Sequence, residues 1–438
     1  MMSRSTEKQT SFRPWAVLLG LFSLYAASNG IIMHTLPLMY PELIEEFGWT
    51  EIQVTLPATV FFVIGAITSP PAGVLLDRFS PRLIMIVGAS GIAIAIAMYS
   101  AVSALWQLVA IYAMLGVFLS MSGLVSNMLV LSRWFSRYRG RATGVLLMAS
   151  SLGGVVFPLV MGRGIEQFGW RQTMLGFAII GAVMMLLPLL TLIRNKPSDL
   201  GLGPDGLVRS SSVDQVAGQT GEERRVLPVP GGPTLREALA GRNFYLVALA
   251  TAAVWFAIIA LVQHQSIYLG KDLGIDRAQL PVIFSTFFAS SVVGKLVFGL
   301  LSDRFRTDWV LASSIAVLII GLLILRQADG QENLVLYVYA VIAGIGFSGA
   351  FTSIQLLIAR FYAGQSFGKI LAVLVLVDTL AGALGTRVIA EIRNSTDSYL
   401  PAIDVMVAVS LVAIVAILIM RNPERVQQDL IKQENTST

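Results

Sequence analysis

Three charged side chains interrupt stretches that are otherwise apolar: Lys295, Asp378 and Arg387. If these stretches cross a membrane, each charge near a helix centre costs roughly 2.5–3.5 kcal/mol on insertion scales, so such residues usually have a function. With a helical rise of about 1.5 Å per residue, Lys295 lies about 12 Å before Asp303, and Asp378 lies about 14 Å after Lys369. We therefore expect Lys295 and Asp378 at one depth, where they can form an ion pair.

The elements that position these residues are predicted from composition and hydropathy. The chain has 438 residues, of which 55% are hydrophobic and 13% charged, and its mean hydropathy is +0.74. A soluble protein of this size needs more charge on its surface. Helices are expected in the apolar stretches, because lipid offers the backbone no hydrogen-bond partner. Twelve such stretches are present, at 15–40, 53–76, 83–105, 107–131, 143–162, 172–193, 243–268, 279–301, 309–325, 334–358, 370–390 and 405–420.

The expected fold is therefore an all-α membrane protein of twelve transmembrane helices in two pseudo-symmetric bundles of six. The last helix is expected to begin near Asp404, a few residues before its apolar stretch. A Pro-, Gly- and Ser-rich segment separates the bundles and reads as a linker. The expected parts are an N-terminal six-helix bundle at 1–195, a cytoplasmic linker at 196–241, a C-terminal six-helix bundle at 242–420 and a cytoplasmic tail at 421–438.

The distribution of positive charge predicts the orientation of the helices. Most of the 31 Lys and Arg residues lie in the two tails and the even-to-odd loops, and six lie in the loops of the opposite side. Cytoplasmic loops of membrane proteins carry an excess of Lys and Arg. We therefore expect the protein in the cell membrane (plasma or inner membrane), with both termini in the cytoplasm. The net charge of +5 is then a topology signal, and no nucleic-acid partner is expected.

The two halves repeat one another. Asp77, Arg78 and Phe79 return 226 residues later as 303–305, each time directly after a long apolar run. Repeats of this kind indicate two related bundles, which is how many secondary transporters are built, with the substrate near the midplane.

The G-x-x-x-D-R pattern in both halves resembles the loops of the major facilitator superfamily. Other segments resemble its monocarboxylate porter and oxalate–formate exchanger branch: "EEFGWT", "SRWFSRYRGRATG", "FGWRQT" and "NKPSDLGLGPDG". The family loop also expects a glycine where this chain has Ser80, and the second copy lacks the basic end.

The resemblance implies a latch between the halves on the cytoplasmic side. A carboxylate there accepts hydrogen bonds from a facing helix N-terminus, and small residues let the helices approach. The alternative is that the arginines only mark inside loops and the aspartates are their surface partners. The residues assigned to gating are Gly73, Asp77, Arg78, Arg82, Gly299, Asp303 and Arg304.

The resemblance also implies that Lys295 anchors the carboxylate of a substrate, because this branch carries a cation there. Ser291 stands where animal porters have an aspartate, and the mid-helix ionisable residue of 370–390 is Asp378, where oxalate exchangers have a second cation. One cation favours a monoanion. Ser291, four residues before Lys295, is also assigned to substrate binding. Further substrate-lining candidates follow from depth alone: Tyr25, Ser122, Ser150, Trp255 and Ser348.

A charge-switch mechanism follows from the expected ion pair. Protonation of Asp378 would release Lys295 to bind the anion, which couples one proton to one carboxylate. A structural ion pair without substrate contact is the alternative. His264 and His34 are further candidates for proton coupling. Arg387 is expected to extend its side chain to the outer interface and not to pair with Asp378.

The expected function is secondary transport of a small organic anion, most simply proton-coupled monocarboxylate symport by a monomer in a lipid bilayer. An anion exchanger or a porter of another small solute is the alternative. A non-transporting membrane sensor is the alternative of a different class. No enzyme, cofactor or metal site is expected, because the sequence has no metal cluster, nucleophile elbow or ATP-binding loop.

The topology can be tested by cysteine labelling, because the chain contains no cysteine. A cysteine at Gln9 should resist an impermeant maleimide added to intact cells, whereas a cysteine at Ser395 should react. Permeabilised cells serve as the control in which both react. Labelling of the first from outside, or protection of the second, would contradict the predicted orientation.

Overall fold

The computed structural model describes residues 11–207, 233–330, 333–362, 364 and 366–420. Eleven of the helical segments in this part of the chain are long and apolar enough to cross a membrane. Large apolar side chains such as Leu19, Ile179 and Leu300 are more than 60% exposed on these helices. Such surfaces fit lipid rather than water, and the all-helical membrane fold predicted from the sequence is confirmed.

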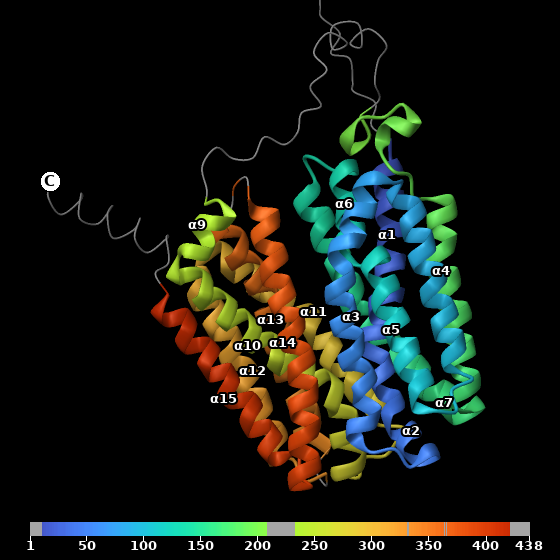
Figure 1. Ribbon diagram of the computed structural model, residues 1–438, viewed down its shortest axis with the longest axis vertical. Coiled ribbons are helices and arrows are strands. Elements are labelled where there is room, and N and C mark those ends of the chain that lie inside the picture. The colour runs from blue at the N-terminus through green and yellow to red at the C-terminus, as the bar shows by residue number, and fades with distance from the viewer. Residues whose placement is uncertain (1–10, 208–232, 331–332, 363, 365, 421–438) are drawn as a thin grey trace, which may run out of the picture. The chain divides into compact units, whose positions relative to one another are not determined.

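The first half of the protein consists of successive helices that are interrupted at several points (Figure 1). Its elements are α1 (Arg13–Asn29), the π-helical turn η1 (Gly30–Thr35), the 3-10 turn η2 (Leu36–Met39), α2 (Tyr40–Phe47), α3 (Glu51–Arg78), α4 (Pro81–Tyr99), α5 (Leu105–Ser122), α6 (Leu124–Trp134) and α7 (Arg139–Thr191). The single helix predicted for 107–131 is thus two helices, α5 and α6, because the backbone at Gly123 is extended.

The second half begins with a short helix and continues with six long ones (Figure 1). Its elements are α9 (Leu235–Ala240), α10 (Arg242–Ile267), the π-helical turn η5 (Tyr268–Asp272), α11 (Leu280–Arg304), α12 (Thr307–Gln327), α13 (Asn333–Tyr362), α14 (Phe367–Thr396) and α15 (Leu400–Ile419). The last helix begins at Leu400, so Asp404 lies within its first turns.

The eleven long segments account for the twelve predicted spans. α7 is 53 residues long, and at Gly169 its backbone leaves the helical region, with φ 76° and ψ 161°. A positive φ suits glycine, which has no Cβ. The two predicted spans 143–162 and 172–193 lie on either side of this residue, so the helix turns where the sequence predicts a loop.

Contacts divide the chain into two compact units. Unit 1 contains residues 1–33, 67–153 and 168–227, and unit 2 contains 34–66, 154–167 and 228–438. α3 and α7 contribute to both units. The bundle boundaries predicted from the sequence, at 195 and 242, stay a prediction.

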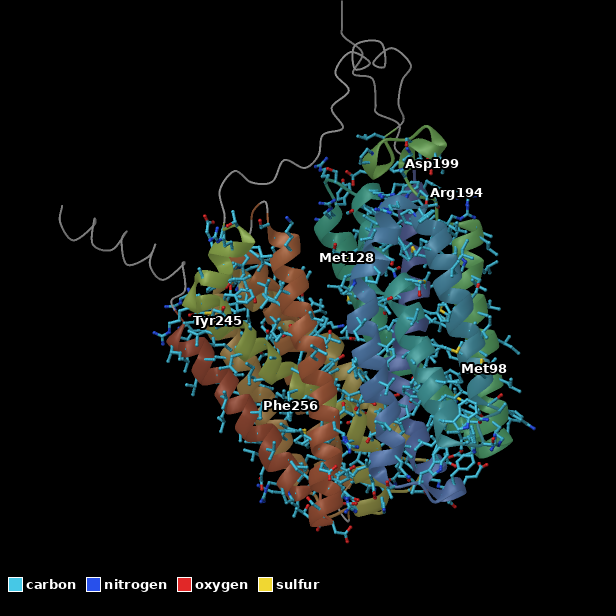
Figure 2. The ribbon with its side chains drawn as sticks, in the orientation of Figure 1. Met98, Met128, Arg194, Asp199, Tyr245 and Phe256 are labelled. Atoms are coloured by element: carbon cyan, nitrogen blue, oxygen red, sulfur yellow. The ribbon has the colours of Figure 1, made fainter. Side chains whose placement is uncertain are left out.

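Small residues decide which helices of unit 2 pack closely. α10 packs along α14, and α13 packs against both α11 and α12. A Cβ on Gly385 would collide with the backbone carbonyl of Phe256, which Figure 2 labels on α10. A Cβ on Gly346 would likewise collide with the backbone of Leu318 on α12. Glycine is therefore required where these backbones meet.

The segment after α7 is folded at its start. Two 3-10 turns lie here, η3 (Pro197–Leu200) and η4 (Pro204–Gly206); Figure 2 labels Asp199 in the first turn and Arg194 just before it. The carboxylate of Asp205 accepts hydrogen bonds from the backbone N–H groups of Ser136, Arg137 and Tyr138, which precede α7. A carboxylate at a helix N-terminus is favourable. Residues 208–232 of the predicted linker, and the tail at 421–438, lie outside the described residues.

The close approach of α10 and α14 makes Gly385 a sensitive position. Gly385→Ala should destabilise the protein by roughly 1–3 kcal/mol, because the added Cβ meets backbone that cannot move aside. Gly368→Ala on the same helix is the matched control, because a Cβ there meets nothing within 4 Å. Thermal unfolding of both purified variants measures the difference. Equal melting temperatures would show that the two helices are not held this closely.

Candidate functional site

Asp378 is buried in the interface between α14 and α10. The residue is 3% exposed, and its carboxylate accepts a hydrogen bond of 2.6 Å from the hydroxyl of Thr251. A hydroxyl can both donate and accept, so it can donate to a carboxylate and accept from a carboxylic acid. Thr251 therefore remains a partner of Asp378 in both protonation states.

Lys295 lies on α11 and faces an aromatic ring. Its ammonium nitrogen is 5.8 Å from the centroid of the Phe351 ring on α13. A cation at this distance is attracted to the negative face of the ring. The predicted cation therefore has an aromatic partner on the neighbouring helix α13.

Trp255 meets the same ring from α10. The Trp255 and Phe351 rings lie edge to face, with centroids 5.8 Å apart. The indole Nε1 of Trp255 is buried and has no hydrogen-bond partner among the described residues. A buried donor without an acceptor is costly, and buried Trp N–H groups usually have a partner. We call Lys295, Phe351 and Trp255 the aromatic cluster; it brings together two of the predicted substrate residues and one that the sequence analysis missed.

The ion pair expected between Lys295 and Asp378 is absent from the described part of the chain. Asp378 binds Thr251 instead, and Lys295 lies over Phe351. The reason is helix packing: α14 packs mainly on α10, whereas α11 packs mainly on α13. Equal depth was predicted from the helical rise, but it does not determine which way each side chain faces.

The predicted serines of unit 2 bond to their own helices. Ser291 donates to the carbonyl of Phe288, and Ser348 donates to that of Gly344. Ser348 also lies where a Cβ on Gly294 would be, so it belongs to the contact between α11 and α13. Hydroxyls that satisfy backbone carbonyls in this way are common in helices. Their role in substrate binding stays a prediction.

The predicted residues of unit 1 meet in part. Tyr25 is 5% exposed and shares a hydrogen bond with Ser150, whose hydroxyl donates to the side-chain oxygen of Asn29. Ser122 donates to the carbonyl of Phe118 at the end of α5. Tyr25 and Ser150 are thus one polar group with Asn29, a residue the sequence analysis did not select.

The two histidines have different surroundings. His264 Nε2 lies 2.9 Å from the carbonyl oxygen of Thr386, and its Nδ1 lies 3.0 Å from the hydroxyl of Tyr399. A carbonyl only accepts, so Nε2 carries the hydrogen and the neutral ring accepts from Tyr399 at Nδ1. This arrangement joins α10, α14 and α15. His34 lies in η1, with its ring 4.0 Å from that of Phe288. Proton coupling by either histidine stays a prediction.

Comparison with known proteins identifies the family. The model of the Major Facilitator Superfamily matches residues 17–265 and 244–437, which is most of the chain. The chain belongs to the Major Facilitator Superfamily. This is a family of transporters rather than enzymes.

Relatives within the superfamily are distant and functionally varied. The chain is 26% identical over 272 residues to the membrane sensor protein UhpC of Salmonella typhimurium, covering 60% of this chain and 59% of that one. It therefore spans less than two thirds of that relative. It is 21% identical over 339 residues to a phosphoglycerate transporter protein of the same organism, covering 75% and 71%. It is 26% identical over 325 residues to the agnestins efflux protein AgnL12 of Paecilomyces divaricatus, covering 73% and 67%.

A solved structure shows the same fold. It is a bacterial homologue of the human lysosomal transporter Spinster, in an inward-facing, unoccupied conformation. The TM-score is 0.67 at 15% identity, with 94% of this chain and 96% of that chain covered. The likeness supports the superfamily fold and carries no information on the substrate of this chain.

The gating residues of the superfamily motif have separate surroundings here. Arg82 donates to the carbonyls of Leu189 and Leu190 in the last turns of α7, where a cation is favourable. Asp303 is exposed, and its carboxylate has no ion pair or hydrogen bond in the described residues. Arg78 and Arg304 are exposed. The side chain of Asp77 lies outside the described ones.

The two motif glycines have open space around them within the described residues. A Cβ on Gly73 or on Gly299 would meet no described atom within 4 Å, and their predicted role in helix approach stays a prediction. A latch that includes Asp77 and Asp303 stays a prediction.

An ion-pair cluster was missed by the sequence analysis. It lies in unit 2, at the helix ends opposite Asp303. Arg393 has only 7% of its side chain exposed and binds Asp272 at 3.0 Å and Asp397 at 2.6 Å. The guanidinium of Arg393 holds the pKa of Asp397 below its ordinary value by hydrogen bonding. Lys271 binds Glu51 from α3 nearby.

Arg387 binds neither Asp378 nor this cluster. Its guanidinium is 3.3 Å from the carboxylate of Glu391, one turn further along α14. The expectation that it would not pair with Asp378 is therefore met. Among the described residues, no group of three or more His, Asp or Glu side chains could hold a metal ion.

The bond between Thr251 and Asp378 can be measured by a double-mutant cycle. Thr251→Val should lower the free energy of unfolding by about 1–3 kcal/mol, because it leaves a buried carboxyl without its partner. In an Asp378→Leu background the same change should cost far less. Thr251→Ser, which keeps the hydroxyl, is the control. An equal cost of Thr251→Val in both backgrounds would mean that the hydroxyl does not hold Asp378.

Proposed function

We propose that this protein is a secondary transporter of a small organic anion and couples uptake of a monocarboxylate to a proton. The observation that carries the proposal is the aromatic cluster, where a cation and an unpartnered indole N–H meet one ring. We propose that it works by alternating access, as a monomer without cofactors, in a cell membrane with both termini in the cytoplasm.

The aromatic cluster has the donors that a carboxylate needs. Lys295 offers a positive charge with three N–H donors, and Trp255 offers a single neutral donor. Phe351 lies against both and supplies an apolar surface for the short carbon chain of the ligand. A lysine is a point charge rather than a bidentate fork, so it suits one small carboxylate group.

Asp378 is proposed as the proton carrier. It is buried between α10 and α14, where the described residues place no cation within ion-pair distance. The hydroxyl of Thr251 can donate to the carboxylate and accept from the carboxylic acid. A carboxyl group can therefore gain and lose a proton here without leaving a buried polar atom unpaired.

The coupling follows from total charge rather than from contact. In the substrate-free protein, Lys295 and Asp378 carry opposite charges, and the sum of these two charges is zero. Binding of a monoanion at Lys295 adds one negative charge, and a proton on Asp378 restores the sum to zero. Net charge within the membrane span is costly, so the protein changes between its two states either with both the anion and the proton bound or with neither bound.

Two other functions follow from particular observations. The resemblance to the phosphoglycerate transporter protein and to the agnestins efflux protein favours a porter of another solute. The resemblance to the membrane sensor protein UhpC favours a sensor that binds a solute without transporting it.

Transport in liposomes distinguishes these functions. In a panel of labelled lactate, pyruvate, acetate, formate and oxalate, the wild-type protein should accumulate a monocarboxylate when the outside is more acidic. Asp378→Asn, which stays neutral, should still exchange the substrate across the membrane but should no longer concentrate it. Asp404→Asn is the control, because Asp404 is about half exposed and pairs with Arg326. Accumulation by Asp378→Asn would show that the proton is carried elsewhere.

Lys295→Gln tests the anion site in the same assay. This variant should lose binding of every substrate of the wild-type protein, because the positive charge is gone. Binding without transport by the wild-type protein would favour the sensor. Transport of larger or uncharged solutes, with monocarboxylates rejected, would favour the other porter.

A further inference from the structure

Two arginine side chains meet at one backbone carbonyl at the end of α7. Arg82, in the first turn of α4, donates from Nε to the carbonyl of Leu189 at 2.6 Å and from Nη2 to that of Leu190 at 2.7 Å. Arg194 follows the last residue of α7 by three positions and donates from Nη1 to the same Leu190 carbonyl at 3.4 Å. Two positive charges therefore lie next to one another at this helix end. We call Arg82 and Arg194 the arginine pair.

No carboxylate balances the arginine pair among the described residues. Neither guanidinium has an ion pair there, and the charged group that acts on Arg82 is Arg194 itself. Both side chains are only partly buried. A guanidinium has five N–H donors, and the bonds to backbone carbonyls use two of them in each residue. The arginine pair therefore retains both positive charge and hydrogen-bond donors for an anion.

The second half of the chain has a different arrangement at the matching position. The residue 226 positions after Arg82 is Asp308, whose carboxylate accepts two bonds from the guanidinium of Arg306, at 2.6 and 3.2 Å. The repeat therefore carries an ion pair at this position in one half and two neighbouring cations in the other. The helices of the repeat do not need a pair of like charges in order to fold, which favours a ligand for the arginine pair.

An apolar surface extends from the arginine pair along two neighbouring helices. The start of α4 contacts the end of α7 through Arg82, and the carbonyls of Ser100 and Val102, just beyond α4, accept from Arg171 of α7. α4 and this part of α7 therefore run side by side in opposite directions. Figure 2 labels Arg194 at one end of these helices and Met98 toward the other.

Each of the two helices has one exposed apolar face. The side chains of these faces are between 46% and 66% exposed and recur at intervals of three, four or seven residues: Leu83, Val87, Ile94 and Met98 on α4, and Ile179, Val183, Leu187 and Leu190 on α7. This spacing places the side chains of each helix on one face. Leu83 and Leu190 lie next to the residues that form the arginine pair or accept its bonds, so each apolar face begins at the positive charges.

We propose that the arginine pair and these two apolar faces bind an anionic glycerophospholipid. The phosphate accepts hydrogen bonds from Arg82 and Arg194, and the acyl chains lie on α4 and α7. Arginine suits a phosphate because its planar fork can donate two parallel bonds. In the predicted orientation this end of the helices lies at the cytoplasmic leaflet, where anionic lipids gather and basic sites between helices bind head groups. The lipid site belongs to unit 1 and is separate from Lys295 in unit 2.

Lipid binding to the purified full-length protein tests this site. Native mass spectrometry of the delipidated protein, titrated with phosphatidylglycerol or with phosphatidylcholine of the same chains, gives the binding constants. The wild-type protein should prefer phosphatidylglycerol, because phosphatidylcholine has no net charge. Arg194→Gln should weaken binding of phosphatidylglycerol roughly fivefold, which is the effect of one positive charge near an anionic lipid surface, and should leave phosphatidylcholine unaffected.

Three further variants separate this site from a general effect of charge. Arg194→Lys retains the charge and should bind phosphatidylglycerol nearly as the wild-type protein does. Arg139→Gln is the matched control, because Arg139 also donates to a backbone carbonyl, that of Ser132, which accepts from no second arginine among the described residues. Arg194→Glu places a carboxylate beside Arg82 where the phosphate would bind. The melting temperature of this variant should therefore no longer rise with phosphatidylglycerol, whereas that of the wild-type protein should.

The outcomes decide between a lipid, a free anion and no site. Unchanged binding of phosphatidylglycerol by Arg194→Gln would overturn the proposal, and so would an equal loss in Arg139→Gln, which would mean that the lipid responds only to total charge. Inorganic phosphate is titrated in the same melting experiment. If it stabilises the wild-type protein as much as phosphatidylglycerol does, and this effect is lost in Arg194→Gln, the arginine pair binds a free anion and the lipid is excluded.

Discussion

The structure depends on one requirement: backbone polar groups in apolar surroundings need hydrogen-bond partners. Helices meet this requirement by themselves, which is why the described part of the chain is built from long helices. Where a helix ends or breaks, side chains take over. Arg82 donates to carbonyls at the end of α7, and Asn127 donates to two carbonyls at the break after α5.

The charged side chains of unit 2 have different partners at the helix ends and in the middle of the span. The ion pairs of unit 2 gather at helix ends, where Arg393 and Lys271 bind acidic side chains. Deeper in the span the ionisable groups are kept apart. Asp378 has a hydroxyl as its partner, and Lys295 has an aromatic ring. These two contacts involve a neutral hydroxyl and a neutral ring, which is the arrangement on which the proposed charge coupling rests. A tight ion pair at this depth would favour a single state and would compete with the substrate.

Glycines determine which of these groups meet. Gly385 brings α14 against the backbone of α10, and the same contact places Asp378 beside Thr251. Gly294 brings α11 against Ser348 of α13, the helix that also carries Phe351 under Lys295. Close packing thus places Asp378 between α14 and α10, and Lys295 between α11 and α13. The absence of a direct contact between them is a consequence of backbone approach rather than of charge.

The sequence alone predicted what depends on distance along a helix and on composition. Hydropathy and helical rise predicted the long spans and the depths of Lys295 and Asp378, and the repeated Asp-Arg pattern predicted the superfamily, which the family match confirmed. The partners of those residues could not be predicted. Thr251 lies 127 residues from Asp378 in the chain. The residues around a threonine in an apolar helix do not indicate which distant side chain its hydroxyl will bind. The break at Gly123 was missed because an uncharged stretch with a single glycine reads as one continuous helix. Rise per residue is a local property of the backbone, whereas the direction in which a side chain faces a neighbour is decided only when distant helices pack.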